Sequence, residues 1–349
     1  MSYDKELTAA KKAVSLAASL CQKVQKELSQ SDVQSKSDKS PVTVADYGSQ
    51  AIVRFVLERE LSDEPLSLVA EEDTEKLRKD SGEDALQRIT KLVNETISND
   101  GSYITSPLST EDILTAIDSG KSKGGSLGRQ WVLDPVDGTK GFIRGDQYAV
   151  ALALLDNGKV VLGVLACPNL PLALASITGN APSENAVGCL FYATVGSGTS
   201  MQSLDGSSPV KVHVSDIGNA EDASFFESYE KAHSMRDLTS SIARKLGVKA
   251  PPVRMDSQAK YGALSRGDGA IYMRLHDKPY TEKIWDHAAG CIIVTEAGGL
   301  VTDAAGQPLD FSKGRYLDVV SGIIATNEKL MPSLLKAVRE SLEEKDSSS

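Results

Sequence analysis

The chain has 349 residues, 40% of them hydrophobic, which is enough for two domains or one large domain with a substantial core. Its formal net charge of −10 argues against non-specific binding to nucleic acid, because such binding needs a basic surface. No apolar run approaches the roughly 18 residues of a membrane span, and four cysteines are too few for a disulfide framework, so we expect a soluble intracellular protein.

The N-terminal part combines a long predicted helix with a polar segment. Apolar residues recur every three or four positions from Leu7 to Leu28, which is typical of an amphipathic helix. Residues 30–41 are polar and predict a mobile loop. This loop is either a solvated linker or a lid whose Lys36 and Lys39 place positive charge over a phosphate site.

A second helix should begin at Asp46 and run to about residue 61. The apolar run Pro65–Ala70 predicts a strand, and three consecutive carboxylates, Glu71 to Asp73, stand at its end. Carboxylates at the end of a strand are usually solvated. Two further helices should follow, one over residues 86–97 and a short one that Thr110 can cap.

The stretch WVLDPVDGTKGFIR, residues 131–144, organises the rest of the chain. Residues 131–133 predict a buried strand, and a tight turn should follow it. Such a turn aims the carboxylates of Asp134 and Asp137 the same way, and the carbonyl of Val136 can point into the same space. Two carboxylates and a carbonyl are hard oxygen ligands, which suit Mg²⁺ better than zinc.

The two residues that follow these carboxylates suit an anion. Gly138 lets a bound group approach the backbone closely. Thr139 offers a hydroxyl and an amide at a predicted helix start, where anions bind well. Taken alone, a DPxDG segment is equally compatible with an ordinary Asp-rich turn.

The middle of the chain predicts an antiparallel sheet. The apolar runs Tyr148–Leu155 and Lys159–Ala166 are separated by Asp156-Asn157-Gly158, and Asn-Gly between apolar runs is a good hairpin signal. Cys167 ends one strand, and Cys189 begins a strand that should pair with it. This pairing would bring the two thiols within disulfide reach, although two buried reduced cysteines are the more common arrangement.

From about residue 216 strands and helices alternate, which implies an α/β domain. The predicted strands are 223–227, 252–256, 270–275 and 322–326, and the predicted helices are 235–247, 257–266, 285–297 and 328–344. We therefore divide the chain into an N-terminal α+β domain, residues 1–215, and a C-terminal α/β domain, residues 216–349.

Two motifs that lie far apart in the sequence together indicate a function for the central stretch. Asp134–Thr139 (DPVDGT) and Trp285–Gly290 (WDHAAG) together resemble the signature motifs of the lithium-sensitive, Mg²⁺-dependent phosphatases, the superfamily of inositol monophosphatase and fructose-1,6-bisphosphatase. Val42–Asp46 resembles the VT-x-AD segment of that superfamily, and Val69–Glu72 resembles its metal-binding GEE, with Ala70 in place of the glycine. The resemblance covers nearly the whole chain and implies a layered αβαβα sandwich with the site between the two domains.

The resemblance implies two to three Mg²⁺ ions in the site. The ligands would be Glu71, Asp134 and the Val136 carbonyl for the first ion, and Asp134, Asp137 and Asp286 for the second. Glu71 would also help to hold a weaker third ion through water, while Asp46 and Thr139 would orient and deprotonate the attacking water. On its own, Asp286 would be interpreted as a simple helix N-cap, and we take His287 as structural because no second histidine lies at ligand spacing.

Four further segments resemble one branch of that superfamily, the 3'(2'),5'-bisphosphate nucleotidases, which include the yeast halotolerance phosphatase and the plant SAL-type enzymes. These segments are residues 138–154, Glu230–Ser234 (EKAHS), Asp256–Tyr261 (DSQAKY) and Ile271–Arg274 (IYMR), with Met273 in place of the usual leucine. The substrate contacts that the match implies are Gly138, Thr139, His233, Ser257, Lys260 and Arg274. Lys260 and Arg274 are the right residue types to clamp a second phosphate. Taken singly, such lysines and arginines are usually solvated, and His233 could cap a helix.

The resemblance implies that the 3'-phosphate of adenosine 3',5'-bisphosphate is removed to give AMP and phosphate. The sulfated analogue, 3'-phosphoadenosine 5'-phosphosulfate, would be a second substrate. Two alternatives stay open: an inositol polyphosphate 1-phosphatase on the same scaffold, with dual activity as an option, and a non-catalytic nucleotide sensor.

The expected partner is a small-molecule substrate, with no nucleic-acid polymer and no membrane, and the expected state is a monomer or a homodimer. Resemblance to plant members implies a chloroplast or a mitochondrion as alternatives to the cytoplasm.

Overall fold

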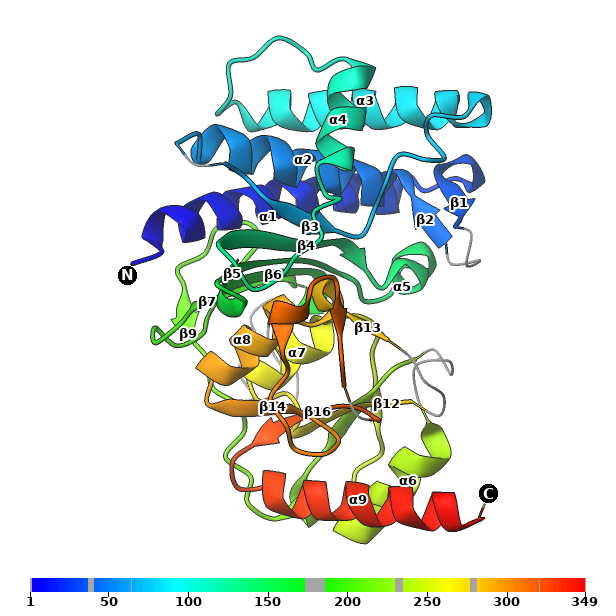
Figure 1. Ribbon diagram of the computed structural model, residues 1–349, viewed down its shortest axis with the longest axis vertical. Coiled ribbons are helices and arrows are strands. Elements are labelled where there is room, and N and C mark those ends of the chain that lie inside the picture. The colour runs from blue at the N-terminus through cyan, green and yellow to red at the C-terminus, as the bar shows by residue number, and fades with distance from the viewer. Residues whose placement is uncertain are drawn as a thin grey trace.

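The computed structural model describes residues 2–36, 41–63, 65–172, 186–229, 235–276, 281–319 and 321–348. Its helices and two main sheets alternate in five stacked layers (Figure 1). The layers are α1 (Asp4–Lys26) with α2 (Val44–Glu60), a seven-stranded sheet, α7 (Ala259–Ser265) with α8 (Ala288–Glu296), a five-stranded sheet, and α6 (Arg236–Leu246) with α9 (Met331–Ser348). Helices α3 (Glu83–Asp100) and α4 (Thr110–Asp118) pack outside α2. The predicted αβαβα sandwich is confirmed.

The seven-stranded sheet follows the chain in order. Its strands are β3 (Leu68–Ala70), β4 (Arg129–Asp137), β5 (Ala149–Asp156), β6 (Lys159–Pro171), β7 (Val187–Thr194), β8 (Ser200–Ser203) and β9 (Val210–Lys211). All neighbours are antiparallel except β3 and β4, which are parallel. The hairpin between β5 and β6 turns at Asn157 and Gly158, whose φ angles of 50° and 76° suit a type I' turn. The predicted hairpin is confirmed, whereas β8 was not predicted.

The five-stranded sheet is mixed. Its order is β11 (Val253–Arg254), β10 (Phe225–Glu227), β12 (Ile271–Leu275), β16 (Gly322–Asn327) and β14 (Gly299–Asp303). Strand β10 is parallel to β11 and β12, while β16 is antiparallel to β12 and β14. The first sheet ends at Lys211 and the second begins at Phe225, on either side of the proposed boundary at residues 215 and 216. The division into two domains stays a prediction.

Two small strand pairs flank the main sheets. Strands β1 (Val33–Ser35) and β2 (Pro41–Thr43) are antiparallel within the segment that was predicted as a loop, and β13 (Glu282–Lys283) pairs with β15 (Tyr316–Leu317). Lys39 lies outside the described residues. Helix α4 is capped by Ser109 rather than by the predicted Thr110, because the Ser109 hydroxyl and the Asp112 carboxylate form a capping box.

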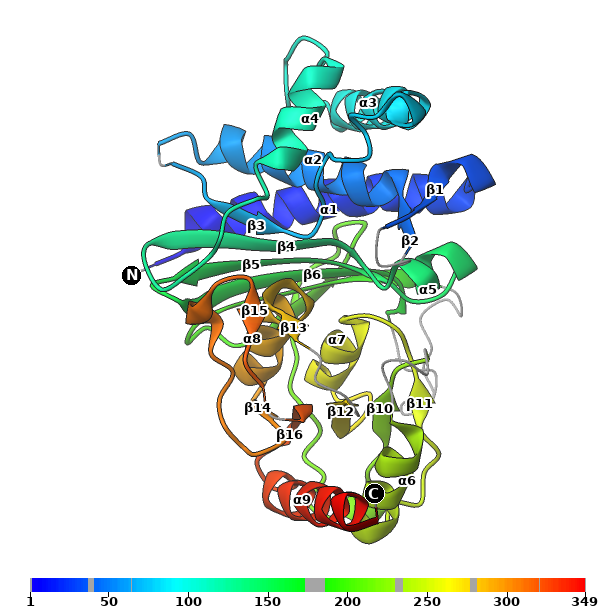
Figure 2. The same ribbon diagram turned by 45° about the vertical axis from the view of Figure 1, so that its right-hand side comes forward.

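The core is divided by the layers, and side-chain size decides how close they come. On β5, Leu152 and Leu154 face α1 and α2, whereas Ala151 and Ala153 face α8 on the other side of the sheet. The small residues let α8 approach closely: a Cβ added at Gly163 on β6 would lie 2.5 Å from the Ile292 side chain. Figure 2 shows α7 and α8 between the two sheets. Every described helix is too short or too polar to span a lipid bilayer.

Candidate active site

Most of the predicted site residues meet in one pocket of about 300 Å³. Its walls come from both halves of the chain: the ends of β3 and β4 with the start of α5 (Thr139–Arg144) on one side, and α7, β12 and the turn before α8 on the other. The predicted residues that line it are Glu71, Asp134, Val136, Asp137, Gly138, Thr139, Ser257, Lys260, Arg274 and Asp286. Asp46 is buried and touches this set through Thr139. His233 and its EKAHS segment lie outside the described residues.

A β-bulge brings two of these carboxylates to the same face of β4. Asp134 pairs with Ala151 and Asp137 pairs with Ala149, so three steps along β4 match two steps along β5. In a regular strand, residues three apart point to opposite faces, and the extra residue turns Asp137 back to the face of Asp134. The predicted tight turn is therefore wrong, because this segment remains part of the strand. The predicted convergence of the carboxylates is confirmed.

Gly138 links β4 to α5 in a backbone conformation that favours glycine. Its φ is +87°, a value that other residues rarely adopt. A Cβ at this position would also lie 2.9 Å from the Cβ of Ser257, which comes from the segment before α7. The glycine therefore allows the two halves of the site to approach each other.

Asp46 and Thr139 are in direct contact. Asp46 lies in the first turn of α2, behind the N-cap Thr43, and not at the helix start as predicted. Its Oδ2 accepts hydrogen bonds from the Thr43 amide at 2.8 Å and hydroxyl at 2.7 Å, and its Oδ1 lies 3.2 Å from the Thr139 hydroxyl. The Val136 carbonyl oxygen is also 3.2 Å from that hydroxyl. Burial raises the pKa of Asp46 to about 6, so this carboxyl can exchange a proton near neutral pH.

The pocket concentrates carboxylates that repel one another. Burial, with the neighbouring carboxylates of Glu71, Asp137 and Asp286, raises the pKa of Asp134 well above its usual range. Burial likewise raises the pKa of Asp137 to about 6 and that of Asp286 to about 7. Buried carboxylates in such a group are stable as anions only beside cations. The donors are all oxygen atoms, so the residues present fit Mg²⁺.

Lys36 supplies one protein cation at this cluster. Its Nζ lies 2.7 Å from Glu71 and 2.5 Å from Glu72. Glu72 was expected either to be solvated or to support the ligands without binding the ions, and its burial excludes the first alternative. The Gln50 side chain donates to the Glu72 carbonyl and accepts from the Glu72 amide. Lys36 also lines the pocket, which favours the lid interpretation for this lysine over a solvated linker.

Lys260 and Arg274 are among the other cationic side chains that line the pocket. Lys260 on α7 is buried, its ammonium donates to the Met255 carbonyl at 2.9 Å, and burial lowers its pKa to about 8. Arg274 on β12 donates to Glu282 at 2.7 Å through Nε and to Asp286 at 3.4 Å through Nη2. One pocket thus holds a cluster of carboxylates beside several cationic side chains, with Lys260 and Arg274 on the wall opposite Lys36.

Ser257 and Gln258 join α7 to the metal-ligand candidates. Ser257 has a φ of +66°, a strained value for a residue with a side chain, of the kind that gathers at functional sites. This conformation places the Gln258 amide 2.5 Å from the Asp137 Oδ2 atom. The Gln258 side chain donates to the Trp285 carbonyl at 2.8 Å and accepts from the Gly290 amide at 3.1 Å. Gln258 lies in the DSQAKY segment, which could have pointed to it.

Asp286 lies in a short 3₁₀ turn, Ile284–Asp286, that precedes α8, and so it does not open the helix as predicted. Glu282, Asp286 and His287 place ligand atoms within 4.8 Å of one another. His287 is fully buried, however, and its two ring nitrogens contact Glu282 at 2.9 Å and the Tyr261 hydroxyl at 2.8 Å. We therefore interpret His287 as structural, in agreement with the sequence-based prediction.

Arg315 connects the two halves of the site and was missed in the sequence. Its guanidinium donates to the carbonyls of Ala70, Gly120 and Ser122 at 2.6, 3.1 and 2.9 Å. Its Cζ lies 4.6 Å from the centre of the Trp285 ring. Ala70 and Trp285 each directly precede a metal-ligand candidate. A lone arginine in a polar segment carries no sequence signal for such a role.

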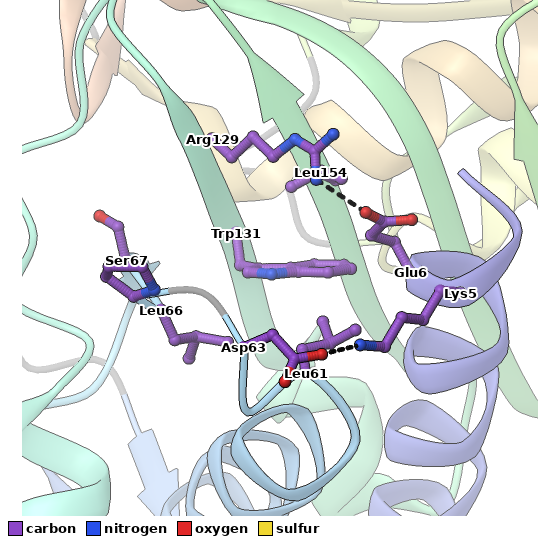
Figure 3. A pocket seen from close by; sticks show the side chains of 10 residues that line it. Lys5, Glu6, Leu61, Asp63, Leu66, Ser67, Arg129, Trp131 and Leu154 are labelled. Carbon is purple, nitrogen blue, oxygen red and sulfur yellow. Dashed lines mark hydrogen bonds and ion pairs between the residues drawn. The ribbon is translucent and has the colours of Figure 1, made fainter. Parts of the chain in front are cut away.

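A separate pocket of about 130 Å³ lies on the side of β4 that faces α1 and α2 (Figure 3). Trp131 lines it together with two ion pairs, Arg129 with Glu6 at 2.8 Å and Lys5 with Asp63 at 2.7 Å. The predicted site residues all lie elsewhere. We assign no ligand to this pocket.

Comparison with known proteins places the chain in a family. The model of the inositol monophosphatase family matches residues 6–343. The chain is 71% identical over 351 residues to 3'(2'),5'-bisphosphate nucleotidase 1 of Arabidopsis thaliana, covering 100% of this chain and 99% of that protein. It is 65% identical over 345 residues to 3'(2'),5'-bisphosphate nucleotidase of Oryza sativa, covering 99% of this chain and 96% of that protein.

Solved structures share the fold. The extragenic suppressor protein suhB from Bartonella henselae matches with a TM-score of 0.62 at 20% identity, covering 95% of this chain and 98% of that chain. At this identity the likeness shows the fold alone. Together with the matched family model and the full-length relatives, it leads to one conclusion: the chain belongs to the inositol monophosphatase family, whose members typically depend on metal ions.

Proposed function

We propose that this chain is a Mg²⁺-dependent 3'(2'),5'-bisphosphate nucleotidase that hydrolyses the 3'-phosphate of adenosine 3',5'-bisphosphate to AMP and phosphate. Full-length relatives with 71% and 65% identity carry that nucleotidase name. The observation that carries the proposal is the pairing of an acidic cluster with Lys260 and Arg274 in one pocket. We propose 3'-phosphoadenosine 5'-phosphosulfate as a second substrate because it carries the same 3'-phosphate.

The acidic cluster would hold the ions. When bound, Mg²⁺ supplies the positive charge that a phosphate dianion and its transition state require. The assignments are Glu71, Asp134 and the Val136 carbonyl for the first ion, and Asp134, Asp137 and Asp286 for the second, with Glu71 reaching a weaker third ion through water. The burial of these carboxylates and their mutual repulsion support this assignment.

Asp46 and Thr139 would prepare the attacking water. The Thr139 hydroxyl lies 3.2 Å from Asp46 Oδ1. A water that donates its proton to the Thr139 oxygen therefore allows Thr139 to pass its own proton to Asp46. Burial raises the pKa of Asp46 to about 6, which suits a general base near neutral pH.

The opposite wall would select the substrate. Lys260 and Arg274 would bind the 5'-phosphate, and the Ser257 hydroxyl would add a donor. Gly138, Thr139 and His233 complete the proposed substrate contacts, with His233 assigned from the sequence alone. The monomeric or homodimeric state and the compartment, whether cytoplasm, chloroplast or mitochondrion, stay predictions.

Phosphate release from a panel of substrates tests the proposal. The panel contains adenosine 3',5'-bisphosphate, 3'-AMP and inositol 1,4-bisphosphate, each with Mg²⁺ and with a chelator. We expect the highest kcat/KM for the nucleotide bisphosphate, and no release with the chelator. A preference for the inositol substrate would favour the inositol polyphosphate 1-phosphatase alternative, and nucleotide binding without any turnover would favour a sensor.

A further inference from the structure

Behind Arg274 lies a buried network that the motifs did not reveal. Glu282 on β13 is fully buried, and its Oε1 accepts a hydrogen bond from Arg274 Nε at 2.7 Å. The same oxygen also contacts His276 Nε2, and Oε2 lies 2.9 Å from His287 Nε2. His287 is held in turn by the Tyr261 hydroxyl at 2.8 Å. Glu282 is therefore held directly by Arg274, His276 and His287. Through His287 it is also linked to Tyr261 of α7.

The network determines how Arg274 is presented to the pocket. A bond at Nε fixes the rotation of the planar guanidinium, and so it determines where the terminal nitrogens point. Arg274 contacts a second carboxylate, Asp286, through Nη2 at the longer distance of 3.4 Å. Both carboxylates attract the same cation, but only Asp286 lines the pocket with Arg274. If Glu282 lost its charge, the guanidinium would be drawn toward Asp286.

We propose that Glu282 is a positioning residue for substrate selectivity, which holds the Arg274 guanidinium in place for a 5'-phosphate and away from full pairing with Asp286. This inference rests on the proposed function, because it takes Arg274 as a contact of that phosphate. His276 and His287 keep the carboxylate from following Arg274. Glu282 acts through Arg274 and touches no substrate.

The test replaces the carboxylate with an amide of the same shape. Glu282→Gln should lower kcat/KM for adenosine 3',5'-bisphosphate by about tenfold or more, the size of one lost charge-assisted contact. At saturating Mg²⁺ it should change kcat/KM for 3'-AMP, which lacks the 5'-phosphate, by less than about threefold. A second readout is independent of turnover. The Kd for AMP, which carries only the 5'-phosphate, should rise by about tenfold in calorimetry.

A double-mutant cycle separates positioning from a structural role. The quantity compared is the ratio of kcat/KM for adenosine 3',5'-bisphosphate to that for 3'-AMP, and Arg274→Ala should lower it. The double variant Arg274→Ala/Glu282→Gln should show the same ratio as Arg274→Ala, because the two residues act as a unit. The matched control is Glu227→Gln. Glu227 is a buried glutamate on β10 that accepts from Arg254 Nε at 2.8 Å. The Glu227→Gln variant should have a lower Tm than the wild type but an unchanged ratio of kcat/KM values.

The outcomes are distinct. If Glu282→Gln keeps the wild-type ratio and AMP affinity while Arg274→Ala loses both, the positioning role is overturned and the proposed function stands. If Arg274→Ala itself leaves the ratio unchanged, the proposed 5'-phosphate contact fails and the inference fails with it. If Glu282→Gln does not fold, Glu282→Asp keeps the charge but withdraws it by one methylene. That variant should show a smaller loss of the ratio in the same direction, and an unchanged ratio would overturn the inference.

Discussion

Replacing Arg315 with alanine should weaken metal binding even though Arg315 is not a proposed ligand. Its guanidinium ties the carbonyl of Ala70 to those of Gly120 and Ser122 and stacks on Trp285. Ala70 precedes Glu71, and Trp285 precedes Asp286. Two proposed ligands from opposite halves of the chain are therefore steadied by one side chain.

The expected magnitude follows from these contacts. A hydrogen bond from a charged donor contributes about 1.5–3 kcal/mol, but Arg315 is half-buried and its bonds share one cation. We therefore expect Arg315→Ala to lower the free energy of unfolding by about 3 kcal/mol in total. A domain stable by about 5–15 kcal/mol remains folded after such a loss. Looser support of the ligands should raise the Mg²⁺ concentration for half-maximal activity by roughly tenfold, which corresponds to about 1.4 kcal/mol.

Two assays and one matched control test this prediction. Mg²⁺ activation curves report the metal concentration that activity requires. Mn²⁺ serves as a spectroscopic substitute for Mg²⁺, and the loss of its free signal in electron paramagnetic resonance reports metal binding without turnover. The control is Arg129→Ala, because Arg129 pairs with Glu6 in the separate pocket of Figure 3. Its Cζ atom also lies 5.7 Å from the centre of the Tyr3 ring, so it too combines an ion pair with an aromatic contact. Equal losses of Tm in the two variants, with metal binding unchanged in both, would refute the reasoning.

Further predictions concern the ligands, the pH and the thiols. Asp134→Asn should abolish turnover with an unchanged circular dichroism spectrum, and near-normal activity would contradict the metal assignment. Burial raises the pKa of Asp286 from 3.8 to about 7. The Tm of the metal-free protein should therefore fall as the pH rises from about 4 to about 7, where the folded state holds a proton that the unfolded state has lost, and saturating Mg²⁺ should remove that fall. Calorimetric Tm curves that coincide with and without Mg²⁺ would argue against this prediction. Cys167 and Cys189 are buried, reduced and directly opposite each other in β6 and β7, so an oxidant should join them in a disulfide. The reaction should be slow because burial raises the pKa of Cys189 to about 11. Thiol counting should detect the loss of two free thiols, and Cys189→Ser should prevent it.

Local patterns in the sequence predicted the main helices and strands, whereas the resemblance to the phosphatase superfamily implied the layers and the site. Apolar periodicity predicts the main helices, and the Asn-Gly hairpin predicts how β5 meets β6. The motifs marked residues that line one pocket. The bulge in β4 was missed because a Pro- and Gly-containing segment is equally typical of a tight turn. Strand pairing with β5, a long-range contact, decides between the two forms.

The supporting residues could not be predicted for a different physical reason. Glu282 and Arg315 act through partners that lie far away in sequence or in a different element. In sequence each is an ordinary charged residue within a polar stretch, where a solvated side chain is the usual outcome. Their roles follow from burial and from the carbonyls or side chains that the fold brings to them.

The most direct test of the central claim is the ratio of kcat/KM for adenosine 3',5'-bisphosphate to that for 3'-AMP, measured in the wild type and in Arg274→Ala. The claim is that one pocket holds the reacting phosphate at the acidic cluster and the second phosphate at Lys260 and Arg274. It predicts that the ratio falls by about tenfold or more in the variant, while 3'-AMP is hydrolysed nearly as before. Equal losses for both substrates, or no loss for either, would contradict it.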